Sequence, residues 1–100
     1  MTASEHPRHH LNDLLTHPVR FSLAAALAAT DEIEFAPVRD HLQVSDSVLS
    51  RQASALEEAG IVRIRKGYVG KRPRTWLSLT ADGRTAWNAH LVALREIAGA

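Results

Sequence analysis

Residues 45–79 read SDSVLSRQASALEEAGIVRIRKGYVGKRPRTWLSL, and the period of their apolar side chains changes at Ile61. Before Ile61 the apolar residues recur at i, i+4 and i+7, which predicts a helix over residues 45–59 with Ser45 as its N-cap. Gly60 stands where a residue in the left-handed conformation would end that helix. The core-facing residues of the predicted helix are Leu49, Ala53 and Leu56.

Downstream of this helix the period becomes two, which predicts a β-hairpin. Val62 and Ile64 alternate with basic residues in the first strand, and Leu77 and Leu79 share one face of the second. Residues 67–74 between the strands are predicted to form a loop, which two glycines let turn tightly and one proline stiffens.

The predicted hairpin concentrates positive charge. The formal net charge is only +1, yet six of the twelve basic residues lie within twelve positions, and no acid occurs between Glu58 and Asp82. This local charge indicates more about partners than the net charge does. Trp76 falls on the face opposite the leucines, so it is predicted to lie away from the main core or to pack across the stems of Arg63 and Arg65. The six basic residues are Arg63, Arg65, Lys66, Lys71, Arg72 and Arg74.

Three further helices are predicted around this segment. One begins at a proline and covers residues 18–29, a second covers about residues 36–42, and Thr80 caps a last one. Residues 33–35 are too short for more than a single edge strand or an extended linker. The order helix, strand, helix, helix, strand, strand, helix predicts a mainly helical α+β fold, the winged helix-turn-helix.

Length and composition limit the domain organisation. A chain of 100 residues with 45% hydrophobic content makes one compact domain, predicted over residues 11–100 after a flexible tail over residues 1–10. The absence of cysteine excludes disulfides, thiolate metal sites and cysteine nucleophiles. The longest apolar run, residues 23–29, is too short to span a membrane, so a cytoplasmic protein without a membrane partner is predicted.

A helix-turn-helix followed at once by a basic hairpin predicts double-stranded DNA as the partner. The helix over residues 45–59 would lie in the major groove, and the wing over residues 67–74 would meet the neighbouring backbone or minor groove. Arg51 has the reach to contact a guanine edge or a phosphate. Arg72, and then Arg74, is best suited to a narrow minor groove. The candidate DNA-binding residues are Ser45, Ser47, Ser50, Arg51, Ser54, Arg65, Lys66, Lys71, Arg72 and Arg74.

The succession of motifs resembles the small single-domain winged-helix regulators related to the MarR group of bacterial transcription factors. The resemblance covers roughly residues 11–94 and is carried by the set in order, since each motif alone is weak. It implies a homodimer that binds near-palindromic operators and usually represses transcription. The motifs are HPVR (17–20), LSR (49–51), LEEAG (56–60), RPRTW (72–76) and LTADGR (79–84).

The resemblance also implies a dimer interface made by the first and last helices, which agrees with their excess of apolar residues. The sequence departs from its relatives at residues 53–55, where they carry a larger apolar residue and basic side chains, so the wing would have to supply more of the backbone grip. A crevice between the long helices of the dimer is the expected place for a small-molecule effector of unknown identity. The candidate interface residues are Leu14, Leu15, Phe21, Trp87, Leu91 and Leu94.

No catalytic, cofactor or metal site is predicted, and the chain is not expected to be an enzyme. It has no glycine-rich phosphate loop, no Ser-His-Asp arrangement in a plausible context and no paired carboxylates placed for a cleft. His9, His10 and His17 lie near Asp13, but the first two fall in the predicted tail, and His90 has no ligand partner at i+3 or i+4.

Two alternatives remain open at this point. Asp46 either stabilises the start of the recognition helix or accepts a hydrogen bond from a cytosine amino group. Winged helices also serve as protein-interaction modules, in which case the basic wing would meet an acidic protein and bind no operator.

Overall fold

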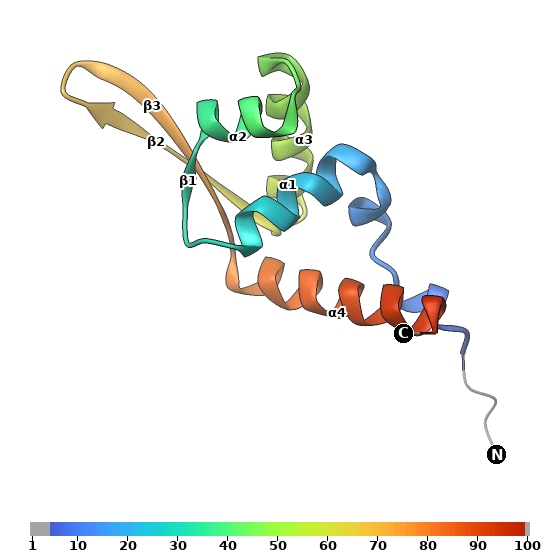
Figure 1. The fold of residues 1–100 in the computed structure, drawn as a ribbon. Helices are drawn as coiled ribbons and strands as arrows, with labels where there is room; N and C mark the ends of the chain where they lie inside the picture. Colours follow the sequence, from blue (N-terminus) through green and yellow to red (C-terminus); the bar gives the residue numbers. More distant parts are fainter. Residues whose placement is uncertain (1–4, 100) are drawn as a thin grey trace.

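A computed structural model describes residues 5–99 as four α-helices, a three-stranded sheet and two short 3-10 helices (Figure 1). This order confirms the predicted winged helix-turn-helix fold, mainly helical with a small antiparallel sheet. The 3-10 helices are Pro7–His10 and Asp13–Thr16; the α-helices are α1 (Pro18–Ala28), α2 (Phe35–Leu42), α3 (Asp46–Glu58) and α4 (Ala81–Ala98); the strands are β1 (Ile33–Glu34), β2 (Val62–Val69) and β3 (Arg72–Leu79).

The helices α1, α3 and α4 begin at side chains that accept hydrogen bonds from free backbone N–H groups, whereas α2 has no such cap. Ser45 Oγ accepts from the N–H of Val48 at 3.2 Å, and Thr80 Oγ1 accepts from the N–H of Gly83 at 2.8 Å, as the sequence predicts. At α1, His17 Nδ1 accepts from the N–H of Val19 at 3.1 Å. These caps fix where the helices start.

A tight turn joins α2 to α3. Gln43 ends α2 in the left-handed conformation with a φ of 56°, and the N–H of Val44 donates to the carbonyl of Arg39 at 3.3 Å. The turn redirects the chain within two residues, so α3 starts at its cap in a new direction. This is the helix-turn-helix that the sequence predicts.

The hairpin is longer and its turn tighter than the sequence indicates. A loop over residues 67–74 was the expectation, and it is wrong, because Gly67 pairs with Arg74 and Tyr68 with Pro73 inside the antiparallel ladder. Only two residues, 70 and 71, form the turn, and Gly70 takes the positive φ of 62° that such a turn needs. Pro73 fits because β1 pairs only with Trp76 and Leu77, which leaves one edge of β3 open at the proline.

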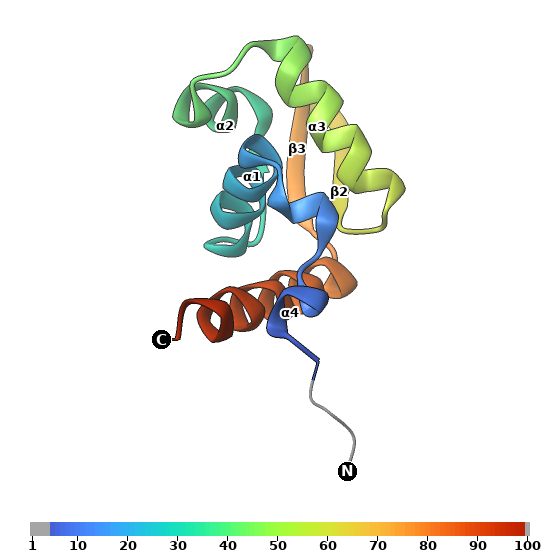
Figure 2. The ribbon, with the colours of Figure 1, turned by 90° about the vertical axis from the view of Figure 1, so that its right-hand side faces the viewer.

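The core forms where α1 meets the other helices and the base of the hairpin. α1 contacts α2, α3, α4 and β3, and Figure 2 shows the first three helices grouped above α4. Cross-strand pairs Val62 with Leu79 and Ile64 with Leu77 turn one hairpin face toward this core. The fully or nearly fully buried apolar residues are Leu15, Leu23, Ala24, Leu27, Val38, Leu49, Ala53, Leu56, Ile61, Val62, Leu77, Leu79, Trp87 and Ala93.

The N-terminal segment lies beside the last helix. Pro7–His10 forms a 3-10 helix that contacts α4, and its N-cap His6 accepts a hydrogen bond from the N–H of Arg8. Residues 1–4 of the predicted flexible tail, and Ala100 at the end of the predicted domain, lie outside the described residues. The predicted boundary at residue 11 stays a prediction.

We predict that Gly83→Ala destabilises the fold, although alanine is the better helix former. Gly83 lies in the first turn of α4 against the backbone of Ile61, and an added Cβ would overlap the Ile61 carbonyl. The free energy of unfolding in urea should fall by about 1–3 kcal/mol, the usual cost of overpacking. Asn88→Ala, at an exposed position of the same helix, is the control and should change stability little. An unaltered unfolding midpoint for Gly83→Ala would show that α4 is not held this closely.

We predict that stability falls as the pH drops below about 6.5 because of His90. This side chain is 1% exposed, its Nδ1 accepts from the N–H of Asn12 at 3.0 Å, and burial lowers its pKa below the ordinary value. A folded pKa below the unfolded one gives stability that is complete above the unfolded pKa and is lost on acidification, by at most about 1.4 kcal/mol per pH unit for one proton.

Urea unfolding of the wild type and of His90→Gln, followed from pH 7.5 to pH 5, measures this dependence. The glutamine variant should lose the decline, whereas the exposed-site control His41→Gln should keep it. An equal decline in all three proteins would rule out His90 as its source.

Candidate nucleic-acid interface

The outer face of α3 is exposed and polar. Its opposite face is buried in the core by Leu49, Ala53 and Leu56, which matches the predicted orientation of the helix. Arg51 has no hydrogen-bond or ion-pair partner within residues 5–99, so its guanidinium group has donors available for a ligand. The candidate residues on the exposed face are Ser47, Ser50, Arg51 and Ser54.

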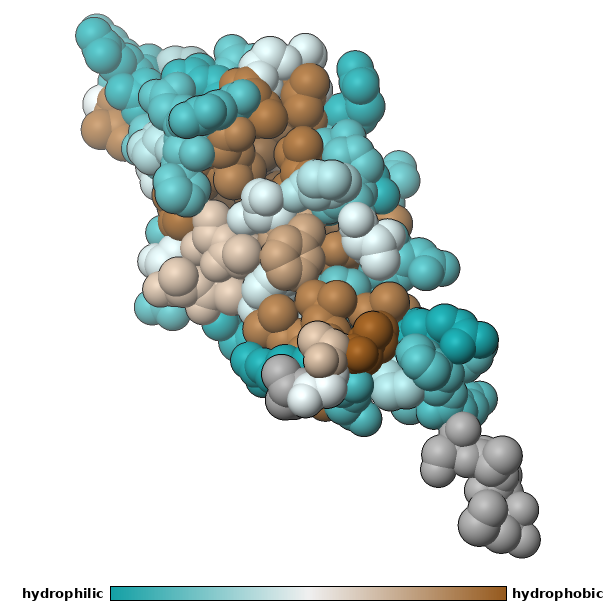
Figure 3. All heavy atoms as spheres, turned by 45° about the vertical axis from the view of Figure 1, so that its right-hand side comes forward, coloured by the Kyte–Doolittle hydropathy of each residue, from teal (hydrophilic) through white to brown (hydrophobic). Residues whose placement is uncertain are grey.

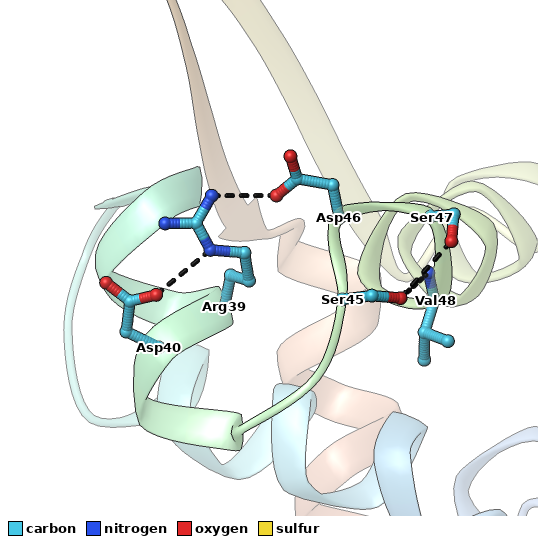
Figure 4. A network of polar contacts seen from close by, with 6 residues as sticks. All are labelled: Arg39, Asp40, Ser45, Asp46, Ser47 and Val48. Atoms are coloured by element: carbon cyan, nitrogen blue, oxygen red, sulfur yellow. Dashed lines mark hydrogen bonds and ion pairs between the residues drawn. The ribbon is translucent and has the colours of Figure 1, made fainter.

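The start of α3 is tied to α2 by a charged link (Figure 4). Arg39 Nη1 donates to Asp46 Oδ1 at 2.8 Å, and Arg39 Nε donates to Asp40 Oδ1 at 3.0 Å. These hydrogen bonds raise the pKa of Arg39 above its ordinary value. Ser45 Oγ lies 3.2 Å from the hydroxyl of Ser47, in addition to its role as N-cap. The link orients the recognition helix, α3. It could not be predicted from the sequence, because Arg39 lies on α2 and Asp46 on α3.

The basic residues of the hairpin fall into two groups. Arg65 donates two hydrogen bonds to Glu32, and Arg74 Nε lies 3.6 Å from Glu34 Oε2. The remaining basic side chains are exposed and have no ion-pair partner within the described part of the chain. These are Arg63, Lys66, Lys71 and Arg72.

The alternation of the strands separates these charges by face. Lys66 lies opposite Thr75, on the face that carries Ile64 and Leu77 toward the core. Trp76 lies on the other face, where the guanidinium carbon of Arg65 stands 4.1 Å from the centre of its ring. The predicted packing of Trp76 across an arginine stem is confirmed.

A groove of about 640 Å³ separates α3 from the hairpin. Ser50 and Ser54, together with the acidic Asp46 and Glu57, line it from α3. Lys66 lines it from β2, over an apolar floor that includes Ile64 and Leu77. Three candidate DNA-binding residues from two elements thus lie around one concave surface. The small side chains of Ala53 and Ser54 keep this surface open.

The candidate dimer-interface residues differ in how much surface they offer. Leu15 is 0% exposed and Trp87 is 6% exposed, so both are buried within their own chain. Phe21 packs against Trp87 with 5.0 Å between ring centres and the rings tilted by 52°, and Leu91 is partly buried against the same core. Leu14 and Leu94 are also partly buried.

The last helix exposes apolar residues that the sequence prediction did not include. Val92 is 49% exposed and Ile97 is 41% exposed. Apolar atoms gather on the lower part of the molecule, where α4 runs (Figure 3). Helical periodicity could not single these residues out, because α4 carries apolar residues beyond its core-facing stripe.

No helix within residues 5–99 is long and apolar enough to cross a membrane. Within this range, no three histidine or acidic side chains group as metal ligands would.

The comparison with known protein families bears directly on this geometry. A family model described as a winged helix DNA-binding domain matches residues 19–98. The chain belongs to this winged helix family. The match includes the helix-turn-helix, the whole hairpin and the whole of α4.

The chain is also similar to individual proteins. The chain is 27% identical over 79 residues to the uncharacterized protein MJ0432 of Methanocaldococcus jannaschii, covering 79% of this chain and 86% of the relative. It is similar to the structure of a transcriptional regulator homologue from Pyrococcus horikoshii, with a TM-score of 0.81, 24% identity, and 86% and 85% of the two chains covered.

A third similar structure is the M. tuberculosis transcriptional regulator MosR in complex with DNA, with a TM-score of 0.67 and 21% identity. It covers 81% of this chain and 57% of MosR. The predicted resemblance to small winged-helix regulators is confirmed at the level of the family, a winged helix DNA-binding domain, and the similar solved structures are those of transcriptional regulators.

Proposed function

We propose that this winged helix protein is a homodimeric transcriptional repressor that binds a near-palindromic site in double-stranded DNA. The observation that carries the proposal is the groove in which Ser50 and Ser54 of α3 and Lys66 of β2, next to the wing, line one surface. A recognition helix and a cationic wing on a common surface match the two parts that a winged helix uses on a duplex.

In this proposal α3 enters the major groove. Its short hydroxyl side chains permit close approach to the bases, and Arg51 supplies a fork of donors that suits the O6 and N7 acceptors of guanine. Ser45 contributes less to base contact, because its hydroxyl caps the helix. The ion pair between Arg39 and Asp46 holds the start of the helix during this contact.

The wing contacts the sugar-phosphate backbone or the minor groove. Lys71 lies in the turn and Arg72 directly follows it; both are exposed and have no ion-pair partner within the described residues. Arg72 takes the minor-groove role, because Arg74 is already near Glu34. MosR, whose structure has a similar fold, was solved in complex with DNA, which supports a duplex as the ligand.

The dimer forms through the first and last helices. Leu91 and Leu94 contribute the partly buried centre of the contact, and Val92 and Ile97 extend it. Two copies related by a two-fold axis would present their recognition helices to two half-sites, which is why the operator is proposed to be near-palindromic.

Selection of bound duplexes from a random pool, combined with light scattering, tests the proposal. The expected results are an enriched near-palindromic sequence and the mass of a dimer. A monomer that enriches no duplex would contradict the proposal and favour a protein-interaction module.

We predict that replacing the cations at the wing tip weakens binding to all duplexes. Each lost phosphate contact should flatten the log–log salt dependence of affinity by about 0.9, so Lys71→Gln with Arg72→Gln should flatten it by about 1.8 per protomer. Fluorescence anisotropy over a range of salt concentrations measures the slope. Arg95→Gln, at an exposed position on α4, is the control for loss of a positive charge outside the wing and should leave the slope unchanged. An unchanged slope in the wing variant would remove the wing tip from the interface.

We predict that Arg51→Ala relaxes sequence discrimination at one operator position. Loss of a bidentate contact to guanine should reduce the preference for that base by about 1–3 kcal/mol. Competition between operators substituted at each position measures the preference, and Ser47→Ala on the same exposed face serves as a comparison. A uniform loss of affinity across all operators would instead identify Arg51 as a backbone contact.

A further inference from the structure

Glu32 and Glu34 meet the wing from outside the hairpin. Glu32 directly precedes β1, and Glu34 is the last residue of that strand. β1 pairs along the edge of β3 at Leu77 and Trp76. The Glu32 carboxylate accepts from Arg65 through two bonds, Nε to Oε2 at 3.0 Å and Nη2 to Oε1 at 2.8 Å. These hydrogen bonds lower the pKa of Glu32 and raise the pKa of Arg65. A two-bond contact fixes the plane of the guanidinium group as well as its position.

An aromatic ring holds the same guanidinium group from its other side. Arg65 and Trp76 are directly opposed across β2 and β3, and the guanidinium carbon lies 4.1 Å from the ring centre. A Cβ at Gly67 would lie 3.2 Å from Cζ3 of this ring, so the glycine leaves the space that the indole occupies. Arg65 therefore contacts both a carboxylate of the body and an aromatic ring of the hairpin.

A second contact follows further along the hairpin. Arg74 Nε lies 3.6 Å from Glu34 Oε2, and Arg74 pairs with Gly67, two rows beyond the Arg65 and Trp76 row. Glu34 belongs to the short edge strand β1 and Glu32 directly precedes that strand, while both arginines come from the hairpin. Beyond this row the hairpin has no third strand beside it within the described residues.

We propose that Glu32 and Glu34 are positioning residues for DNA binding, which act through Arg65 and Arg74 to hold the wing at a fixed angle to α3. The inference rests on the proposed function, because the wing must reach the backbone while the helix occupies the groove. Carboxylates repel phosphate, so removing them should tighten DNA binding if only their charge mattered. Removing them should weaken DNA binding if they position the wing.

Binding of a fluorescein-labelled duplex of mixed sequence, measured by anisotropy at several salt concentrations, separates the two roles. Positioning predicts that Glu32→Gln weakens binding about twofold to fivefold, the range that an exposed ion pair supports. The salt dependence should become shallower, because a displaced wing loses contacts at its tip. Tighter or unchanged binding by Glu32→Gln would overturn the proposal.

Asp31→Asn is the matched control, because it removes the same charge one residue away. Asp31 is exposed, and its side chain has no hydrogen-bond or ion-pair partner in the described part of the chain. Binding by this control should be equal to or tighter than that of the wild type.

A double-mutant cycle tests whether Glu32 acts through Arg65. In an Arg65→Gln background, Glu32→Gln should have no further weakening effect. An undiminished effect of Glu32→Gln in that background would contradict the proposal.

Hydrogen exchange without DNA keeps the inference separate from the proposed function. Amides of residues 66–75 should exchange faster in Glu32→Gln than in the wild type, with α1 and α3 unchanged. If the wild type bound no duplex, the proposed function would fail, and so would the role of Glu32 in DNA binding. Faster exchange in Glu32→Gln would still establish that Glu32 restrains the hairpin. Unchanged exchange in the hairpin would overturn this restraint even if the wild type bound DNA.

Discussion

The burial of the hairpin base against the helices is the constraint on which the other features depend. Val62 and Ile64 pair with Leu79 and Leu77, and these side chains join the core formed around α1. Because that face is held in the core, each later residue of the hairpin lies on a fixed face of the sheet and at a fixed distance from the buried base. The same core buries the inner side of α3 through Leu49 and its neighbours. The recognition helix and the wing are therefore set relative to each other by one apolar cluster rather than by a flexible joint.

The register explains how a basic hairpin can be both stiff and available to a ligand. Six basic residues would repel one another on an isolated hairpin, yet Arg65 and Arg74 meet the carboxylates of Glu32 and Glu34. Lys71 and Arg72 remain exposed at the turn. The body thus neutralises two of the six charges and leaves the others, including those at the turn, available to phosphates. Exposed ion pairs contribute little to stability, so their value here is geometric.

The helix-turn-helix uses the same arrangement on a smaller scale. A left-handed residue at Gln43 sets the turn, and the ion pair from Arg39 to Asp46 joins the two helices beyond it. At α3 and at the hairpin alike, a carboxylate forms an ion pair that holds the element in place. The carboxylate's charge repels DNA, while the position of the element that it holds is proposed to favour DNA binding. Family membership, the groove between helix and wing, and the exposed cations all agree with a DNA-binding regulator.

The sequence by itself determined the order of the elements, the caps at Ser45 and Thr80, the core-facing residues of α3 and the exposed face opposite them. These follow from local periodicity and from hydrogen bonds between residues near in sequence, which a pattern can record. The length of the wing was misjudged because glycine and proline suit a loop, while pairing in the ladder decided otherwise. Only the tertiary structure decided that Glu32 meets Arg65 and that Asn12 meets His90. Those partners lie far apart along the chain, and the path of β1 and of the N-terminal segment brings them together. Charge and burial at such sites depend on that path, which no local pattern contains.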